Sequence, residues 1–175
     1  QVSTSGNKLF IKDLTQPDSG FVTILDDTSS DTDLVDNVGD TLILVTNRNA
    51  PNRKVVKVSA KAPQPENWQD LIPETEHVLR ISSGAGFLFA NYIVDAIAKV
   101  KQYDYDGKLV RDIALPGVGS VGGFGGKKDA DTLYFSFANY ITPGSIYAFE
   151  PKAGASSLYN QPKVNFDPSR YAVSY

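Results

Sequence analysis

Residues 86–93 read Gly-Phe-Leu-Phe-Ala-Asn-Tyr-Ile, and the pentapeptide Phe-Ala-Asn-Tyr-Ile of residues 89–93 returns at residues 137–141, 48 residues later. A more distant copy, Thr-Leu-Ile-Leu-Val-Thr-Asn, occupies residues 41–47. Leu42, Phe87 and Leu133 mark equivalent points of the three copies, at steps of 45 and 46 residues. A repeat of this length, built from strand-forming residues, is typical of the blades of a β-propeller.

The rest of the chain has the same character. Short apolar runs rich in β-branched and aromatic residues alternate with turn residues, and no window shows a sustained apolar period of 3.6 residues. This pattern favours strands, so we expect an all-β fold with almost no helix. The expected strands are Lys8–Leu14, Phe21–Asp26, Leu34–Asn37, Thr41–Asn47, Lys54–Ala60, Trp68–Ile72, His77–Ser82, Gly86–Ile93, Ala98–Asp104, Leu109–Ala114, Ser120–Phe124, Thr132–Ala138, Ser145–Glu150, Ser156–Tyr159 and one beginning at Ala172.

Taken four at a time, these runs predict a partial β-propeller of three four-stranded blades plus half a blade. The complete blades are expected at residues 33–75, 76–116 and 117–163, and a half blade of two outer strands at residues 1–32. The second strand of each blade is the most apolar, as expected of a strand covered on both faces. Because the first segment lacks inner strands and the chain begins with Gln1 instead of Met, we expect a piece of a longer array.

Composition excludes several classes of protein. The 175 residues carry a formal net charge of -3 and no extended basic run, so nothing favours a nucleic-acid partner. The absence of Cys excludes a disulfide framework, a thiolate nucleophile and a Cys-based metal site. No apolar run approaches the ~20 residues of a membrane span. We expect a soluble protein without membrane partners, and the sequence does not decide between the cytoplasm and the periplasm.

The glycine-rich segment Gly117–Gly122 fits the pattern GxGxxG, and Gly126 and Lys127 follow it. A phosphate-binding loop of this kind needs a helix after it, whose N-terminus meets the phosphate. Here a strand is expected to follow, at Thr132–Ala138. The glycines are therefore interpreted as positions where backbones approach closely, followed by a hairpin turn at Lys127–Asp131, and no cofactor is expected.

Three further features were weighed as candidate sites. The acidic run Asp26–Asp33 offers oxygen ligands for calcium, but it lacks the turn glycine and distal Glu of an EF-hand loop and is interpreted as a connection between blades. His77 is the single histidine and Ser82 lies near it in sequence, but no GxSxG elbow exists. Trp68 is interpreted as a packing residue on an outer strand. The sequence thus predicts no catalytic, cofactor-binding or metal-binding residue.

Four segments resemble, in order, the prolyl oligopeptidase (prolyl endopeptidase) family of serine peptidases. They span nearly the whole chain, and no one of them is decisive alone. They are TNRNAPNRKVVKV at residues 46–58, NWQDLIPE at residues 67–74, TPGSIY at residues 142–147 and NFDPSRY at residues 165–171.

In that family a seven-bladed propeller caps an α/β-hydrolase domain that carries the catalytic Ser, Asp and His and cleaves short peptides after proline. The resemblance implies that this chain is the second half of the propeller, and that residues 164–175 form an exit segment toward the C-terminal hydrolase domain. It further implies that the chain gates substrate access and is inactive alone.

Other interpretations stay open at this level. A WD- or kelch-like propeller that binds proteins without any hydrolase is the main alternative, although WD and GH dipeptides are absent. A β-sandwich is a third, against which the repeat argues. Because three and a half blades leave apolar faces uncovered, we also expect that two copies could form a homodimer through those faces.

Overall fold

The computed structural model describes residues 6–140 and 144–163. These residues form antiparallel sheets and one short 3-10 helix, Pro65–Asn67, with no α-helix among them. The chain divides into two compact units, residues 1–79 and residues 80–175. Within the described part of the chain, no helix is long and apolar enough to cross a membrane.

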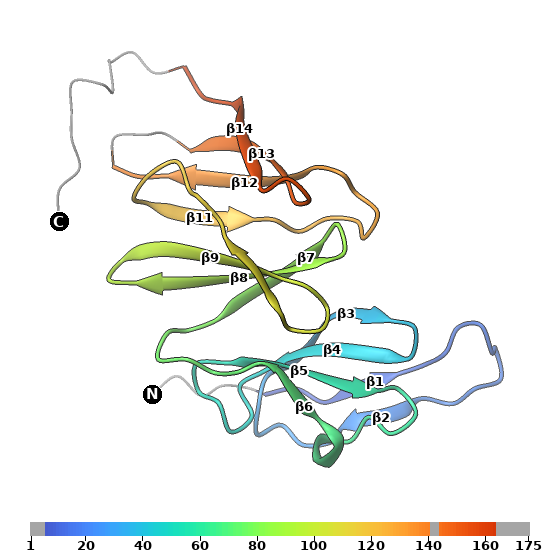
Figure 1. The fold of residues 1–175 in the computed structure, drawn as a ribbon. Coiled ribbons are helices and arrows are strands. Elements are labelled where there is room, and N and C mark those ends of the chain that lie inside the picture. The colour runs from blue at the N-terminus through green and yellow to red at the C-terminus, as the bar shows by residue number, and fades with distance from the viewer. Residues whose placement is uncertain (1–5, 141–143, 164–175) are drawn as a thin grey trace. The chain divides into compact units, whose positions relative to one another are not determined.

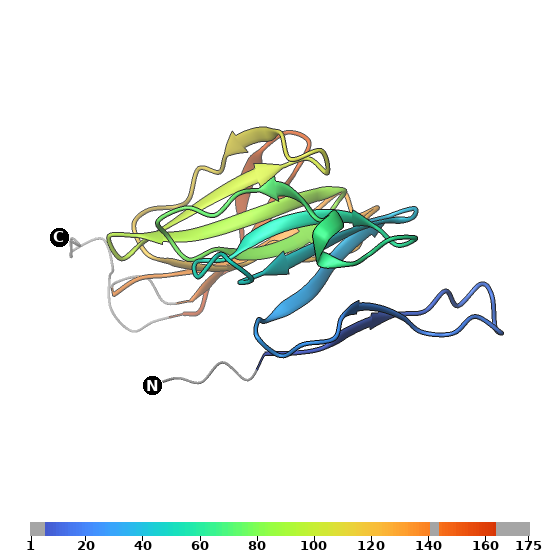
Figure 2. The ribbon, with the colours of Figure 1, turned by 90° about the horizontal axis from the view of Figure 1, so that it is seen from below.

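The first unit contains a two-stranded and a four-stranded sheet. The hairpin pairs β1 (Leu9–Ile11) with β2 (Val22–Leu25), and Figure 2 shows the irregular connection at its far end. The second sheet has the order β3-β4-β5-β6. A core of Ile24, Leu42, Leu44, Val56 and Val58 fills the unit. The bounds of the four strands are Thr32–Val38, Thr41–Thr46, Lys54–Ser59 and Gln69–Ile72.

The second unit contains two four-stranded sheets, each an antiparallel meander in sequence order (Figure 1). The first comprises β7 (Arg80–Gly84), β8 (Phe87–Val94), β9 (Ile97–Tyr103) and β10 (Leu109–Asp112). The second comprises β11 (Ser120–Gly123), β12 (Leu133–Ala138), β13 (Ser145–Glu150) and β14 (Ala155–Asn160). Five of the eight core residues between these sheets are phenylalanines: Phe89, Phe124, Phe135, Phe137 and Phe149.

Tight turns set the register inside each sheet. Asp95 and Ala96, which join β8 to β9, both have positive φ (49° and 63°). Two successive residues of this conformation make the hairpin turn whose twist matches that of the flanking strands. The turn pairs Val94 with Ile97 and places Tyr92 opposite Lys99.

The predicted all-β fold, with three four-stranded sheets, one two-stranded sheet and almost no helix, is confirmed. The most apolar strands behave in two ways. β4 is buried at all but its first position, whereas β12 alternates, burying Leu133, Phe135 and Phe137 and exposing Tyr134. The difference arises because only one face of β12 is covered within the described residues of its unit.

Three local expectations were wrong. His77 was placed in a first strand, but it lies in a bend, and β7 begins only at Arg80. Trp68 was placed on an outer strand, but it follows the 3-10 helix and precedes β6. Phe124 leaves β11 with a φ of 63° instead of continuing it. The exit segment 164–175, with the strand expected at Ala172, lies outside the described residues.

Candidate functional site

The acidic loop after β2 is neutralised by basic side chains. Asp26 accepts a hydrogen bond from Lys8 Nζ at 2.8 Å, and Arg48 Nη1 lies 2.9 Å from Asp27 Oδ2. The Ser29 hydroxyl and amide, and then Arg48, lower the pKa of the Asp27 carboxyl from the ordinary 3.8 to about 2. These contacts use both carboxylates to hold the loop against its neighbours.

A hollow of about 460 Å³ lies beside this loop, lined by residues 23–27, Arg48 and residues 64–66. Glu66 adds a third carboxylate to Asp26 and Asp27 at its wall. In the described part of the chain, no group of three or more His, Cys, Asp or Glu side chains is arranged to hold a metal ion. The hollow thus combines apolar side chains, such as Ile24 and Leu25, with these carboxylates and one cation, Arg48.

The residues of a possible serine-peptidase site have other partners. His77 Nε2 lies 3.5 Å from Glu76 Oε1, and the His77 amide donates to the Thr75 hydroxyl. The Ser82 hydroxyl donates to the Gly123 carbonyl at 3.0 Å. Both side chains therefore serve local structure.

The glycine-rich segment is a packing element. It leads into β11, and the next element is another strand, β12. A Cβ on Gly123 would lie 2.7 Å from the Tyr134 carbonyl oxygen, and one on Gly119 would overlap the Ala138 carbonyl oxygen. Of the three glycines of the GxGxxG pattern, Gly119 is therefore required by close approach to the next strand, whereas a Cβ on Gly117 or Gly122 would make ordinary contacts.

Trp68 stabilises the core of the first unit. Its indole Nε1 donates to the Pro63 carbonyl at 2.9 Å, and its ring packs against the cluster around Leu44. The interpretation of Trp68 as a packing residue agrees with these contacts, although its position on a strand does not.

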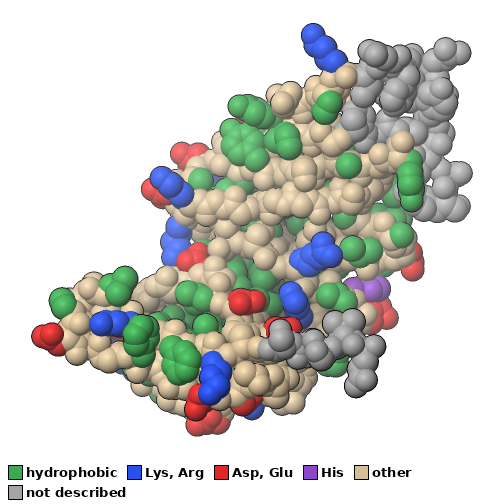
Figure 3. Space-filling view, turned by 180° about the vertical axis from the view of Figure 1, so that it is seen from behind, with side chains coloured by type: hydrophobic (Ala, Val, Ile, Leu, Met, Phe, Trp, Pro, Cys, Tyr) green, Lys and Arg blue, Asp and Glu red, His purple; other side chains and the backbone are tan. Residues whose placement is uncertain are grey.

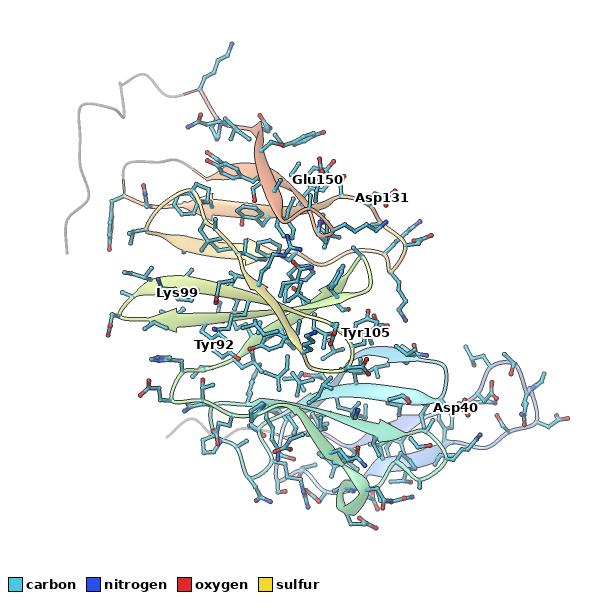
Figure 4. The ribbon with its side chains drawn as sticks, viewed as in Figure 1. Asp40, Tyr92, Lys99, Tyr105, Asp131 and Glu150 are labelled. Atoms are coloured by element: carbon cyan, nitrogen blue, oxygen red, sulfur yellow. The ribbon has the colours of Figure 1, made fainter. Side chains whose placement is uncertain are left out.

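A cavity of about 440 Å³ in the second unit was not expected from the sequence. It lies under the connection from β10 to β11, and its lining is mainly apolar, with Lys99 and Asp112 as its charged members. Figure 4 shows Lys99 on β9 and Tyr92 on β8 at one end of the β7–β10 sheet, and Tyr105 near the other end. The lining residues are Ile97–Val100, Asp112–Leu115, Gly117 and Val118.

The connection beside this cavity is held by a different hydrogen bond from the corresponding segments of the first unit. In the first unit, Asn7 precedes β1 and bonds both the amide and the carbonyl of Thr32, each at 2.7 Å. Asn52 precedes β5 and binds the linker that follows β6 through the Thr75 carbonyl. Before β9 the chain has Asp95 and Ala96 instead, and the linker is held there by the Ala98 amide donating to the Gly119 carbonyl.

Tyr92, on β8 of the β7–β10 sheet, is a buried residue with a polar group. Burial, and then interaction with Tyr103, raise the pKa of the Tyr92 phenol to about 12. The phenol therefore stays protonated at ordinary pH and serves as a structural hydrogen-bonding group.

Two sheet faces expose aromatic residues. On the β11–β14 sheet, Tyr134 and Tyr159 are 46% and 66% exposed and meet edge to face with ring centroids 5.0 Å apart. On the β1–β2 hairpin, Phe10 and Phe21 are exposed. Figure 3 shows hydrophobic side chains on both of these parts of the molecule. Faces of this kind are typical of surfaces that another element covers.

Comparison with known proteins identifies the family to which this chain belongs. The family model "Prolyl oligopeptidase, N-terminal beta-propeller domain" matches residues 1–162. The chain belongs to the prolyl oligopeptidase family. This membership confirms the resemblance seen in the sequence and favours a serine-peptidase propeller over a WD- or kelch-like one.

Individual relatives agree. The prolyl endopeptidases of Elizabethkingia miricola and Elizabethkingia meningoseptica are 49% and 47% identical to this chain over 169 residues. Those residues are 97% of this chain but 24% of each relative, so the chain spans about a quarter of their length.

Solved structures give the same result. A chain from a study of two prolyl endopeptidases and their inter-domain dynamics matches with a TM-score of 0.87 and 27% identity, over 97% of this chain and 25% of that one. Prolyl oligopeptidase B from Galerina marginata matches with a TM-score of 0.80 at 19% identity, over 95% of this chain and 25% of that one, which shows a shared fold.

Proposed function

We propose that this chain is a non-catalytic part of the propeller of a serine endopeptidase that cleaves short peptides after proline. The observation that carries the proposal is its 49% identity to a prolyl endopeptidase of which it covers only 24%. By analogy with the family, the catalytic Ser, Asp and His belong to a C-terminal α/β-hydrolase domain, which is the proposed partner of this propeller.

The contacts of the candidate catalytic residues support the non-catalytic role. A Ser-His-Asp triad needs an imidazole that accepts the proton of the nucleophile. His77 is the only histidine of the 175 residues, and its side chain pairs with Glu76 in a surface bend. The Ser82 hydroxyl donates to the Gly123 carbonyl and so has another role.

The function we propose for the propeller is to restrict access to the hydrolase domain. An array of hydrogen-bonded sheets forms a stiff wall, which excludes large substrates by geometry alone. Enclosing the site also removes water and strengthens the polar contacts made to a bound peptide.

Substrate size tests this gating role. The full-length enzyme is expected to cleave a short proline-containing peptide and to spare the same sequence inside a folded protein. Deleting the propeller should remove this discrimination, while circular dichroism establishes that the remaining domain is folded. A folded hydrolase domain that still rejects the large substrate would contradict gating by the propeller.

We further propose that the 175-residue chain, when free, forms a homodimer through the exposed face around Tyr134 and Tyr159. The support is the edge-to-face pair of exposed rings on that sheet. Light scattering should detect a dimer that Tyr134→Ser with Tyr159→Ser converts to a monomer. A chain that is monomeric before substitution would contradict the proposal.

A further inference from the structure

The two sheets of the second unit are joined by hydrogen bonds as well as by apolar packing. Six of the seven donors, including all four side chains, belong to residues 82–111, and the seventh is the Gly126 amide. The bonds run from Ser82 Oγ to Gly123 O, Asn91 Nδ2 to Val121 O, Gln102 Nε2 to Pro151 O, Arg111 Nη2 to Lys152 O, Ala98 N to Gly119 O, Gly126 N to Ser83 O and Ala85 N to Lys127 O.

Two of these bonds form a backbone clasp, which we define as residues 123–127 against residues 82–85. The Gly126 amide donates to the Ser83 carbonyl at 3.1 Å, and the Ala85 amide donates to the Lys127 carbonyl at 2.8 Å. Figure 1 shows the two participating segments, the β7–β8 turn and the β11–β12 connection. Hydrogen bonds between backbone atoms of separate sheets require the two segments to lie closer together than packing through side chains does.

Glycine makes this approach possible. A Cβ on Gly126 would lie 2.6 Å from Leu133 Cδ2, and one on Gly84 would lie 2.9 Å from the same atom and from the Gly126 nitrogen. A larger residue at position 84 would press on the backbone at Phe124 and Gly126 and push the segments apart, whereas one at position 126 would displace only the end of the Leu133 side chain. Gly125, in contrast, has open space where its Cβ would be.

Buried amides strengthen the seam at its centre. Gln102 is completely buried, and its Nε2 reaches the Pro151 carbonyl at 3.1 Å. Asn91 Nδ2 reaches the Val121 carbonyl at 3.0 Å. Within the described residues Asn91 Oδ1 and Gln102 Oε1 are buried without a hydrogen-bond partner, so each of these side chains contributes one hydrogen bond, through its NH2 group, to the seam.

We propose that the sheets β7–β10 and β11–β14 form a locked pair that stays closed during catalysis, so that peptides do not enter between them. This inference rests on the proposed function, since it concerns the route by which substrate reaches the hydrolase domain. Motions that admit substrate must then occur elsewhere in the enzyme.

A reversible cross-link tests the proposal in the full-length enzyme. Ala85→Cys with Lys127→Cys places thiols on the two residues of one clasp hydrogen bond, and the 175 residues contain no other Cys. We expect kcat/KM for a short proline-containing peptide to agree within about twofold between the oxidised and reduced forms. An oxidised enzyme that loses activity and regains it on reduction would overturn the locked pair. An unsubstituted full-length enzyme that does not cleave this peptide would instead count against the proposed function.

Hydrogen exchange gives a second readout that does not depend on activity or on disulfide formation. The Ala85 amide should exchange slowly, with the core of the unit, because it opens only when the seam opens. Gly84→Ala, whose Cβ would meet backbone atoms of Gly126 and Phe124, should accelerate its exchange, while the control Gly125→Ala, in open space, should not. An Ala85 amide that exchanges at the rate of an exposed loop in the unsubstituted enzyme would show that the clasp is not closed.

Discussion

Phe89 of β8 and Phe124, which follows β11, stack with ring centroids 5.2 Å apart and 17° between the ring planes. Phe149 meets them edge-on, at 6.0 Å and 5.5 Å. This cluster gives the second unit a continuous aromatic core, in contrast to the aliphatic core of the first.

Truncation of this core should be severe. Phe89→Ala removes a ring that is 1% exposed and leaves a cavity, so we expect the free energy of unfolding to fall by about 3–5 kcal/mol. Denaturant unfolding measures the change. Val110→Ala, at an exposed position on β10, is the control and should change stability by less than about 0.5 kcal/mol. Similar losses for both variants would contradict a core centred on Phe89.

The indole of Trp68 should contribute one hydrogen bond. Trp68→Phe keeps an aromatic ring but loses the bond from Nε1 to the Pro63 carbonyl, so stability should fall by about 1 kcal/mol. Circular dichroism during urea unfolding measures this, because the substitution removes the only tryptophan of the chain. Gln69→Ala, at the next and exposed position, serves as the control. An unchanged unfolding midpoint for Trp68→Phe would contradict the role of the indole.

The acidic loop should make stability sensitive to low pH. The pKa of Asp27 is lowered from 3.8 to about 2, so the folded state holds its carboxylate charged where the unfolded state takes up a proton. The stabilisation is complete at pH values above the pKa of the unfolded state, 3.8, and is lost as the pH falls through the folded pKa of about 2. Asp27→Asn should therefore reduce stability at neutral pH. It should also make the difference in stability between neutral and acidic pH smaller.

Thermal unfolding across this range checks the acid prediction. Asp18→Asn, in the exposed β1–β2 connection, is the matched control. The account of the loop is wrong if Asp27→Asn and the unsubstituted chain lose the same stability on acidification.

Tyr92 should act at the alkaline end. Its pKa is raised from 10.0 to about 12, so the unfolded chain releases the phenolic proton before the folded one does. The contribution of this pKa shift to stability is complete below pH 10.0, the pKa of the unfolded state, and is lost as the pH rises toward 12. Tyr92→Phe should remove one late-titrating phenol from the ultraviolet absorbance titration. A titration without any such late component would contradict the burial of this phenol.

The sequence repeat predicted the sheets because its recurring apolar residues are the ones that each sheet buries. Phe89 and Phe137 occupy the same place in the two FANYI copies, and both are buried. The asparagines of the copies differ in role, since Asn91 of β8 donates to Val121 O in the next sheet, whereas Asn139 donates to Val118 O, just before β11 of its own sheet. Local pattern was sufficient for features that depend on one strand and its face.

Features that depend on two distant segments were not predictable in this way. The clasp needs Gly84 and Gly126 to approach one another, and nothing in either glycine's local sequence specifies the other. The cavity beside Lys99 is lined by β9 and by the connection that follows β10, and neither segment's own sequence specifies how the two lie together. Trp68 and His77 were assigned to strands because apolar runs do not show where backbone pairing begins.

Peptide hydrolysis by the isolated 175-residue chain, measured beside the full-length enzyme, tests the central claim most directly. We expect the chain to be folded and to leave a proline-containing chromogenic peptide intact. We expect the full-length enzyme to cleave the peptide and to be labelled by a serine-directed inhibitor outside these 175 residues. Hydrolysis by the isolated chain, or labelling of a serine within it, would contradict the proposal that this propeller segment carries no catalytic residue.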